Sequence, residues 1–226
     1  YMQTVENAWN NAGYEGTNPY IEDRNRSDFA DVDYLDKLFE LGRTQSAQVT
    51  ASGGNNDTDY FLSAGYFGQG GPVVYDNDQY KRFNFRYNVN SNPNDRLKVG
   101  ANLQASYEYK DRISSSGDAP GIIRHAFLRP QIIPVFKDSS DPTYTEADPF
   151  TDLPFFESPD SYESRKYEFS QNPIALARFT DDAARTFKTF GNVFAEYSFL
   201  NDKALKFRTN FGADINFIHN KAFRVN

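Results

Sequence analysis

The sequence LKVGANLQASYEY, at positions 97–109, alternates apolar and polar side chains without interruption. Leu97, Val99 and Leu103 belong to the apolar row, whereas Lys98 and Asn102 belong to the polar row. A period of two is the pattern of a β-strand, because successive side chains point to opposite faces of a sheet. The alternation lasts about 13 residues, whereas a strand in a globular sheet usually has about five or six and a membrane strand needs about 9 to 11. The stretch therefore predicts a strand long enough to cross a bilayer.

Alternation of the same kind recurs along the chain and predicts five further strands. The pattern at 205–217 is nearly as clean as the first, whereas Phe194 interrupts the polar row of another strand. Short clusters of turn residues, such as Gly54-Asn55-Asn56-Asp57, separate the strands pairwise, since Gly and Asn tolerate the positive φ values of a tight hairpin. The six strands therefore form three predicted hairpins. The five further strands are 46–53, 58–68, 82–89, 192–199 and 205–217.

The connections between the hairpins are longer than the turns within them. Residues 112–184 show no sustained period of two, and prolines recur through much of this segment. Short turns that alternate with long loops are typical of an outer-membrane barrel, whose short turns lie at the periplasmic end. The sequence therefore predicts an all-β fold that is part of a transmembrane antiparallel β-barrel, about six strands of a larger one, with long extracellular loops.

Outside the strands, the sequence predicts a few short helices. Apolar residues at roughly helical spacing indicate helices within 1–13 and 31–42, and a further helix is expected at about 119–128. Together with the strands, these features divide the chain into four regions. The predicted regions are a helical and loop lead-in at 1–43, four barrel strands at 44–111, a long extracellular loop at 112–184 and two barrel strands at 185–226.

The composition excludes several classes of protein. No stretch approaches the roughly 18 consecutive apolar residues of a membrane-spanning helix. The chain has no Cys, which removes disulfide frameworks, Cys-based zinc sites and thiol nucleophiles. Its formal net charge of -7 and its singly scattered Lys and Arg residues argue against DNA or RNA as a partner.

A soluble or cell-surface carbohydrate-binding β-sandwich is the alternative that the alternation leaves open. In that fold the apolar rows would face a core shared by two sheets, and the polar rows would face water. The length of the predicted strands argues against it. So does the polar row of 97–109, because Gly100, Asn102 and Ser106 replace the long charged side chains that are typical of an exposed sheet surface.

Several segments resemble the SusC/RagA family of TonB-dependent transporters. QVTASGGN at 48–55 and YFLSAGY at 60–66 resemble the first conserved barrel hairpin of that family. Gln69-Gly70-Gly71, YKRFNFR at 80–86 and LKVGANL at 97–103 follow in the order and spacing of the family. The resemblance covers roughly residues 31–111, although the Trp expected in the lead-in to the hairpin is missing.

The resemblance implies a plugged barrel of 22 strands that imports a large nutrient, an oligosaccharide or a peptide, across the outer membrane of a Gram-negative, Bacteroidota-like bacterium. It also implies a SusD-like surface lipoprotein as a lid, and energy delivered through TonB. Six strands do not close such a barrel, and neither the plug nor the TonB box is among these residues. We therefore expect a partial chain that is not an enzyme, in contact with outer-membrane lipid.

The candidate contact residues are aromatic side chains of the segment 112–184. They either stack on sugars and contact a lipoprotein partner, or pack the loop onto itself. The candidates are Tyr144, Phe150, Phe155, Phe156 and Tyr162.

No catalytic residue, metal ligand or cofactor is predicted. His125 and His219 have no partner at ligand spacing, and the sequence contains none of the nucleotide-binding or hydrolase motifs considered. An acidic run offers oxygen ligands for calcium, but it lacks the spacing and the glycine of an EF-hand, which favours a solvated loop. The run consists of Asp138, Asp141, Glu146, Asp148 and Asp152.

Overall fold

The structure is a computed structural model of the whole chain, and it describes residues 2–13, 30–113, 121–151, 170–200 and 204–223. The chain divides into two compact units. A helical unit comprises residues 1–40, 73–75 and 113–180. A sheet unit comprises residues 41–72, 76–112 and 181–226.

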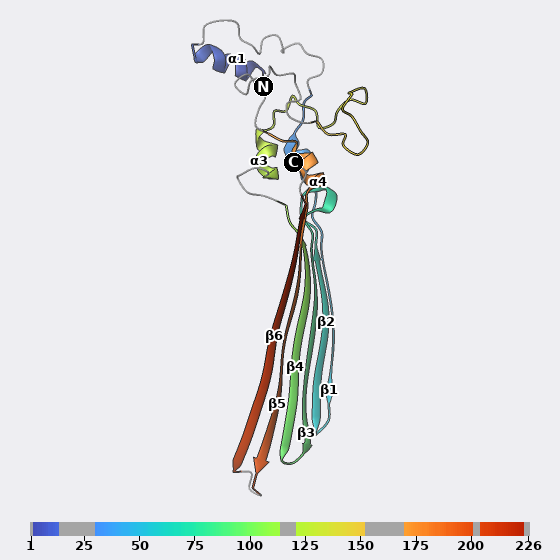
Figure 1. Cartoon of the computed structure of the whole chain (residues 1–226), viewed down its shortest axis with the longest axis vertical. Coiled ribbons are helices and arrows are strands. Elements are labelled where there is room, and N and C mark those ends of the chain that lie inside the picture. The colour runs from blue at the N-terminus through green and yellow to red at the C-terminus, as the bar shows by residue number, and fades with distance from the viewer. Residues whose placement is uncertain (1, 14–29, 114–120, 152–169, 201–203, 224–226) are drawn as a thin grey trace. The chain divides into compact units, whose positions relative to one another are not determined.

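The sheet unit is a single antiparallel sheet of six strands, each paired with its neighbour in the sequence (Figure 1). This arrangement confirms the predicted all-β fold and its six strands. Short turns close β1–β2, β3–β4 and β5–β6, as expected for three hairpins. The strands are β1 (Thr44–Gly54), β2 (Thr58–Gln69), β3 (Tyr80–Asn94), β4 (Leu97–Asp111), β5 (Asp181–Phe199) and β6 (Leu205–Phe223).

The last two strands are longer than the alternation in the sequence indicates. β5 begins at Asp181, inside the segment assigned to a loop, and β6 continues to Phe223. Phe190 and Ile218 lie on the polar row and hide the period of two there. At about 3.3 Å per residue, the 19 residues of β5 span about 63 Å, or about 44 Å along the membrane normal at a tilt of about 45°. Such a strand extends well beyond the apolar band of about 25 Å on an outer-membrane barrel.

The strand register brings the apolar rows of all six strands onto one face. Leu103 of β4 pairs with Tyr87 of β3 and with Gly191 of β5, and each of these continues the row of its own strand. On this apolar face Phe211 is 73% exposed and Phe217 is 65% exposed. Among the described residues no second sheet covers the apolar face, so the core that a β-sandwich needs is absent there.

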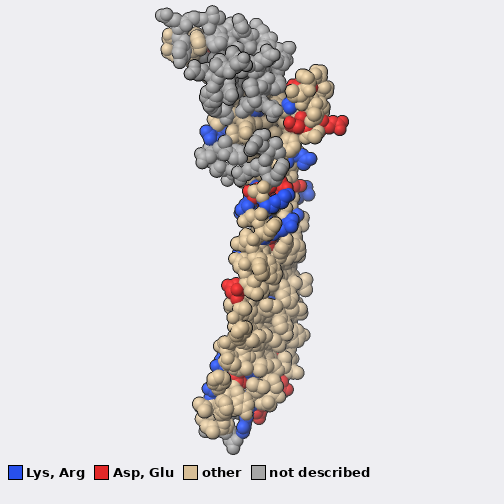
Figure 2. All heavy atoms as spheres, in the orientation of Figure 1, with Lys and Arg blue, Asp and Glu red and all other residues tan. Residues whose placement is uncertain are grey.

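Charged side chains are sparse in the middle of the strands on the side of the sheet shown in Figure 2, where an acidic group lies at the left edge. Over the strands, Lys, Arg, Asp and Glu gather near both strand ends, and the surface between them is largely uncharged (Figure 2). An uncharged band between charged ends suits a sheet that crosses an apolar layer.

Asparagine side chains fix the β1–β2 and β3–β4 turns. Asn55 Oδ1 accepts hydrogen bonds from the backbone N–H groups of Asp57 (2.9 Å) and Thr58 (2.8 Å). Asn94 Oδ1 likewise accepts from the backbone N–H groups of Arg96 and Leu97, both at 3.0 Å. Asparagine mimics a backbone turn in this way, which explains why these positions end and restart the strands.

Three of the short helices of the helical unit pack around a small apolar core. Asp33 begins α2 by accepting hydrogen bonds from Leu35 N and Asp36 N, and Asn172 begins α4 by accepting from Ile174 N and Ala175 N. None of the described helices is both long enough and apolar enough to cross a membrane. The helices are α1 (Met2–Asn11), α2 (Tyr34–Leu38), α3 (Ile122–Leu128) and α4 (Pro173–Phe179). The core cluster consists of Tyr34, Leu38, Val73, Ile122, Ala126, Val135, Phe150, Ile174 and Ala177.

Buried Arg129 holds the helical unit together. Its side chain donates to Tyr34 Oη (3.0 Å), to the carbonyl oxygen of Ser170 (2.9 Å) and to Thr151 Oγ1 (2.8 Å). Only 3% of Arg129 is exposed, so its charge depends on these acceptors for solvation. Asn172 Nδ2 donates a further hydrogen bond to the carbonyl oxygen of Val135 (2.8 Å). The network joins segments that are far apart in the sequence.

Candidate functional site

The polar face of the sheet is the candidate functional site. It is built from the residues that alternate with the apolar rows, and the strand register aligns them across the sheet. Ser63 of β2 pairs with Arg86 of β3, which pairs with Gln104 of β4. One strand further on, Asn102 of β4 pairs with Asn192 of β5. The face therefore presents amides, hydroxyls and guanidinium groups rather than a hydrophobic surface.

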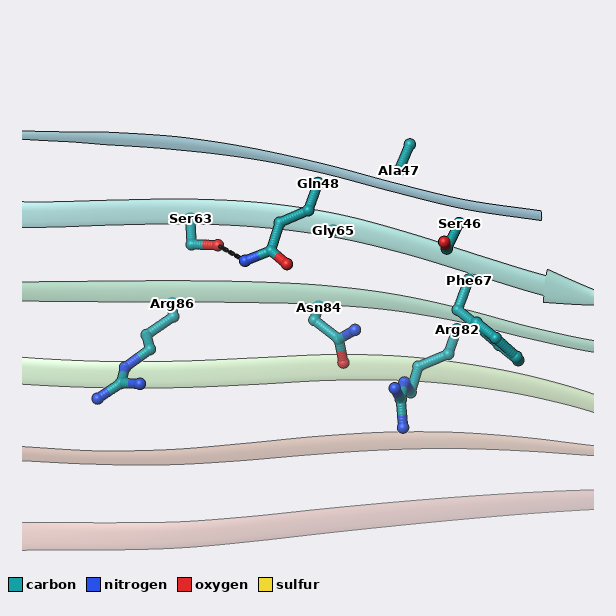
Figure 3. A pocket seen from close by; sticks show the side chains of 9 residues that line it. All are labelled: Ser46, Ala47, Gln48, Ser63, Gly65, Phe67, Arg82, Asn84 and Arg86. Carbon is teal, nitrogen blue, oxygen red and sulfur yellow. Dashed lines mark hydrogen bonds between the residues drawn. The ribbon is translucent and has the colours of Figure 1, made fainter.

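A hollow of about 280 Å³ lies on this face over β1, β2 and β3 (Figure 3). Arg82, Asn84 and Arg86 stand in a row on β3, and their side chains all lean toward β4 (Figure 3). On the other side, Gln48 Nε2 donates to Ser63 Oγ at 3.1 Å. The hollow is thus lined by groups that hydrogen-bond and by two positive charges.

The guanidinium groups of Arg82 and Arg86 lie near aromatic rings of β2. The guanidinium carbon of Arg82 is 5.9 Å from the ring centroid of Phe67, and that of Arg86 is 5.8 Å from the ring of Phe61. The exceptions to the polar row of β2, Phe61 and Phe67, are therefore platforms for arginine. Aromatic rings of this kind hold a guanidinium in place without neutralising it.

A chain of hydrogen bonds crosses the polar face from β3 to β5. In the orientation that satisfies both ends of its amide, Asn88 accepts from Arg86 Nε (3.3 Å) and donates to Asn102 Oδ1 (3.2 Å). Asn102 Nδ2 then donates to Asn192 Oδ1 at 3.1 Å. Such a network fixes the orientation of the side chains, so the polar face is ordered before any ligand arrives.

Phe194, which interrupts the polar row of β5, covers a glycine on the same face. A Cβ atom at Gly100 would lie 2.3 Å from Phe194 Cε1, so only glycine fits beneath the ring. Arg208 lies above the ring, 4.4 Å from the centroid, and pairs with Glu196 at 3.8 Å. An aromatic side chain packed over a glycine supplies the contacts that the glycine cannot make. This explains why Phe194 interrupts the polar row of β5.

The predicted contact aromatics fall into three groups. Tyr144 is half-buried in a turn, where its backbone N–H donates to the carbonyl of Asp141 (2.9 Å). Phe150 is only 3% exposed, and its ring packs edge-on against Phe179 at 5.5 Å between centroids, as in the packing alternative. A substrate contact by Tyr144 stays a prediction. Phe155, Phe156 and Tyr162 lie outside the described residues.

Two exposed aromatics of the helical unit were not predicted as contact residues. Tyr75 (40% exposed) and Phe136 line a hollow of about 670 Å³ together with Lys37 and Glu40. Tyr75 has a φ of 74°, which is uncommon for a residue other than glycine. Arg178 lies 5.5 Å from the centroid of its ring. No local sequence pattern indicates Tyr75, because its conformation depends on packing.

Asp138 and Asp141 of the acidic run serve local turns of the helical unit, and Asp152 lies outside the described residues. Asp138 accepts hydrogen bonds from the side chain and backbone of Ser140, which hold the pKa of its carboxyl below the usual value. Asp141 accepts likewise from Thr143, with the same effect on its pKa. In the described part of the chain, no three acidic or His side chains come together as metal ligands would.

His125 is buried in the helical unit rather than placed at a surface. Its Nδ1 accepts a hydrogen bond from the backbone N–H of Gln171 (3.1 Å). Burial is the main cause that lowers its pKa, with smaller contributions from the charges of Arg124 and Arg129. The side chain is therefore a neutral structural group. His219 lies in β6 opposite Arg185, on the sheet.

Several known proteins resemble this chain in sequence and in fold. No family model matches the sequence. Over 188 residues, or 81% of the chain, it is 27% identical to TonB-dependent receptor P3 of Formosa agariphila. The RagAB peptide transporter matches 85% of the chain with a TM-score of 0.58 and 22% sequence identity. The RagAB peptide importer in the open-open state matches 99% of it, with a TM-score of 0.65 and 20% identity.

The chain is SusC/RagA-like. It spans 16% of the receptor from Formosa agariphila and 20% and 26% of the two RagAB chains. The resemblance predicted from residues 31–111 is confirmed, and so is the fold, since the six-stranded sheet is part of a transmembrane antiparallel β-barrel. A SusC/RagA-like barrel segment of this kind has one face for lipid and one for the interior.

Proposed function

We propose that the chain is part of the barrel of an outer-membrane transporter that imports an oligosaccharide or a peptide with energy from TonB. In this proposal the apolar face contacts lipid and the polar face lines the interior. The observation that carries it is the sheet itself. Its long strands expose one continuous apolar face, which in water would be a far larger apolar patch than soluble proteins tolerate.

The arrangement of the connections supports an orientation in the outer membrane of a Gram-negative, Bacteroidota-like bacterium. The three tight turns lie at the same end of the sheet, because each closes a hairpin of consecutive antiparallel strands (Figure 1). On the rule that short turns are periplasmic, the segment 112–184 lies outside the cell. There it takes part in substrate capture or in docking of a SusD-like lipoprotein, with Tyr144 as a candidate contact.

The alternative is a soluble or cell-surface β-sandwich that binds carbohydrate. It needs a second sheet over the apolar face, and the described residues supply none. A partner sheet from elsewhere would have to cover strands of up to 19 residues. A bilayer covers such a surface without further protein, and the names of the similar proteins, a receptor and a peptide transporter, agree with transport.

Fractionation of cells that contain the protein tests the proposal. We expect the sequence in an outer-membrane band that shifts on heating and whose intact mass is several times the 25.8 kDa of this chain. A soluble species would contradict the proposal and favour the β-sandwich. Capture of the band with a co-purifying surface lipoprotein tests the partner separately, because transport without such a lipoprotein leaves the barrel assignment intact.

A further inference from the structure

Arg82 and Arg86 carry charges that no acidic side chain neutralises. Within the described residues, neither guanidinium forms an ion pair, whereas Arg208, on the same face of the sheet, pairs with Glu196. Arg82 Nε is buried and has no hydrogen-bond partner there. In a protein of net charge -7, two uncompensated arginines in one hollow leave donors available for an anion.

The surrounding charges leave the hollow positive. Glu108 is directly opposite Arg82 in the strand register and lies on the same face, yet the two side chains form no ion pair. Lys188 is opposite Ser106, which itself pairs with Asn84 in the middle of the row. Arg82 and Arg86 on β3 therefore outnumber the carboxylate of Glu108, which lies beside them on β4.

The spacing of the arginines suits an extended ligand. Four residues along a strand place the Cα atoms of Arg82 and Arg86 about 13 Å apart, farther than one small anion reaches. Between them stand the amide of Asn84 and the open floor at Gly65, where a Cβ atom would meet nothing closer than 3.7 Å, and the hydroxyl of Ser63 lies level with Arg86. Amide and hydroxyl groups in this middle part suit the hydroxyls of a sugar better than apolar side chains.

We propose that the hollow at Arg82 and Arg86 is a subsite for an acidic oligosaccharide, whose carboxylate or sulfate groups pair with the two arginines. Hydroxyls of the intervening sugars hydrogen-bond to Asn84, Gln48 and Ser63. The inference rests on the proposed function, since it takes the polar face as the interior surface along which the substrate moves.

Binding to the full-length transporter, purified in detergent, tests the subsite. The probes are an oligogalacturonate, its neutral methyl ester, a sulfated galactose oligosaccharide and a glutamate-rich peptide. We expect at least one acidic sugar to bind about tenfold more tightly than the neutral ester, and the better of the two identifies the anionic group. The double variant Arg82→Gln/Arg86→Gln removes this preference.

Two further variants separate the subsite from general effects of charge and folding. Arg208→Gln removes a positive charge from the same face, but Arg208 pairs with Glu196, so the preference for acidic sugar should persist. Gly65→Leu keeps both arginines and fills the hollow, so it should weaken binding of the acidic probe. All variants are first checked for a normal heat-shifted band in the outer membrane.

The outcomes that overturn the inference are specific. Equal binding of the acid and its ester, an unchanged double variant, no binding of any acidic probe, or a preference for the peptide would each contradict it. None of these results contradicts the proposed function, which fails only if the wild-type protein is absent from the outer membrane.

Discussion

The two units of this chain differ in how far they bury their apolar side chains. The helical unit holds nearly all of the buried apolar residues, and its helices surround a core that includes Leu38 (0% exposed) and Ile133 (0% exposed). The described part of the sheet buries only Ala183 and Phe194 among its apolar side chains, although its strands are longer and richer in aromatics. The helical unit is thus stabilised from within, whereas the sheet must gain its stability from what lies against it.

This difference shows why burial is a poor guide to the role of a residue in a barrel fragment. Phe211 is exposed here and would be a surface residue in a soluble domain, but on the proposed barrel it contacts lipid. Phe150, by contrast, was a candidate for substrate contact and lies in the core of the helical unit. Substitutions confined to one unit should therefore affect the two units differently.

The largest effect is expected from removing the buried cation of the helical unit. Arg129→Ala leaves the acceptors on Tyr34, Thr151 and Ser170 without their donor and opens a cavity, which should cost about 3 to 5 kcal/mol. In limited proteolysis of the full-length protein, residues 121–151 and 170–180 should become sensitive while the sheet stays resistant. Arg124→Ala, on the exposed side of α3, is the matched control. Equal protection of both variants would show that Arg129 does not hold this unit together.

The next largest effect is expected on the apolar face of the sheet. Leu103→Arg places a charge near the middle of β4, and a lipid-facing arginine costs about 2 to 4 kcal/mol at the bilayer midplane. The amount of heat-shifted protein in the outer membrane should fall. Asn102→Lys, one residue away on the polar face, should assemble normally. If Asn102→Lys were the more damaging change, the faces assigned to lipid and interior would be reversed.

Gly100 offers a test of the one large side chain that the sheet buries. Gly100→Ala puts a Cβ atom against the ring of Phe194 and should cost about 1 to 3 kcal/mol, because the ring must leave its place over the strand. Gly212→Ala serves as the control, since its Cβ atom would have contacts no closer than 3.4 Å. The melting temperature of the full-length protein in detergent measures both. Similar melting of the two variants would mean that Phe194 contributes little to the sheet.

The sequence predicted the sheet far better than the helical unit, and the reason is physical. The faces of β4 follow from alternation alone, because neighbouring side chains on a strand point to opposite sides. The interruptions at Phe61, Phe67 and Phe194 resisted interpretation, since each ring packs against a residue of another strand.

In the helical unit the important contacts join distant parts of the chain. Arg129 meets Tyr34, 95 residues away, and Ser170, 41 residues away, so no local pattern reveals the network. α4 was not predicted, although Asn172 before Pro173 is an ordinary start signal for a helix. The hollow at Arg82 and Arg86 was visible only as a polar row, because the absence of an acidic neighbour is a property of the assembled sheet.

The smallest expected effect is a pH dependence confined to the helical unit. Burial keeps the folded-state pKa of His125 below its ordinary value of 6.5, so the unfolded chain binds the proton more readily. The stability from the neutral imidazole is complete above pH 6.5 and falls as the pH drops below that value, where protonation of Nδ1 breaks the bond from Gln171 N. Protease resistance of residues 121–151 and 170–180 should decline over this window. Below the ordinary carboxyl pKa of 3.8, Asp138 and Asp141 add their own loss of stability. His125→Asn, which keeps an acceptor near the same position but does not titrate there, should flatten the decline. A decline that persists unchanged in this variant would assign the pH response to groups other than His125, and a parallel loss of resistance in the sheet would mean that the two units do not open independently.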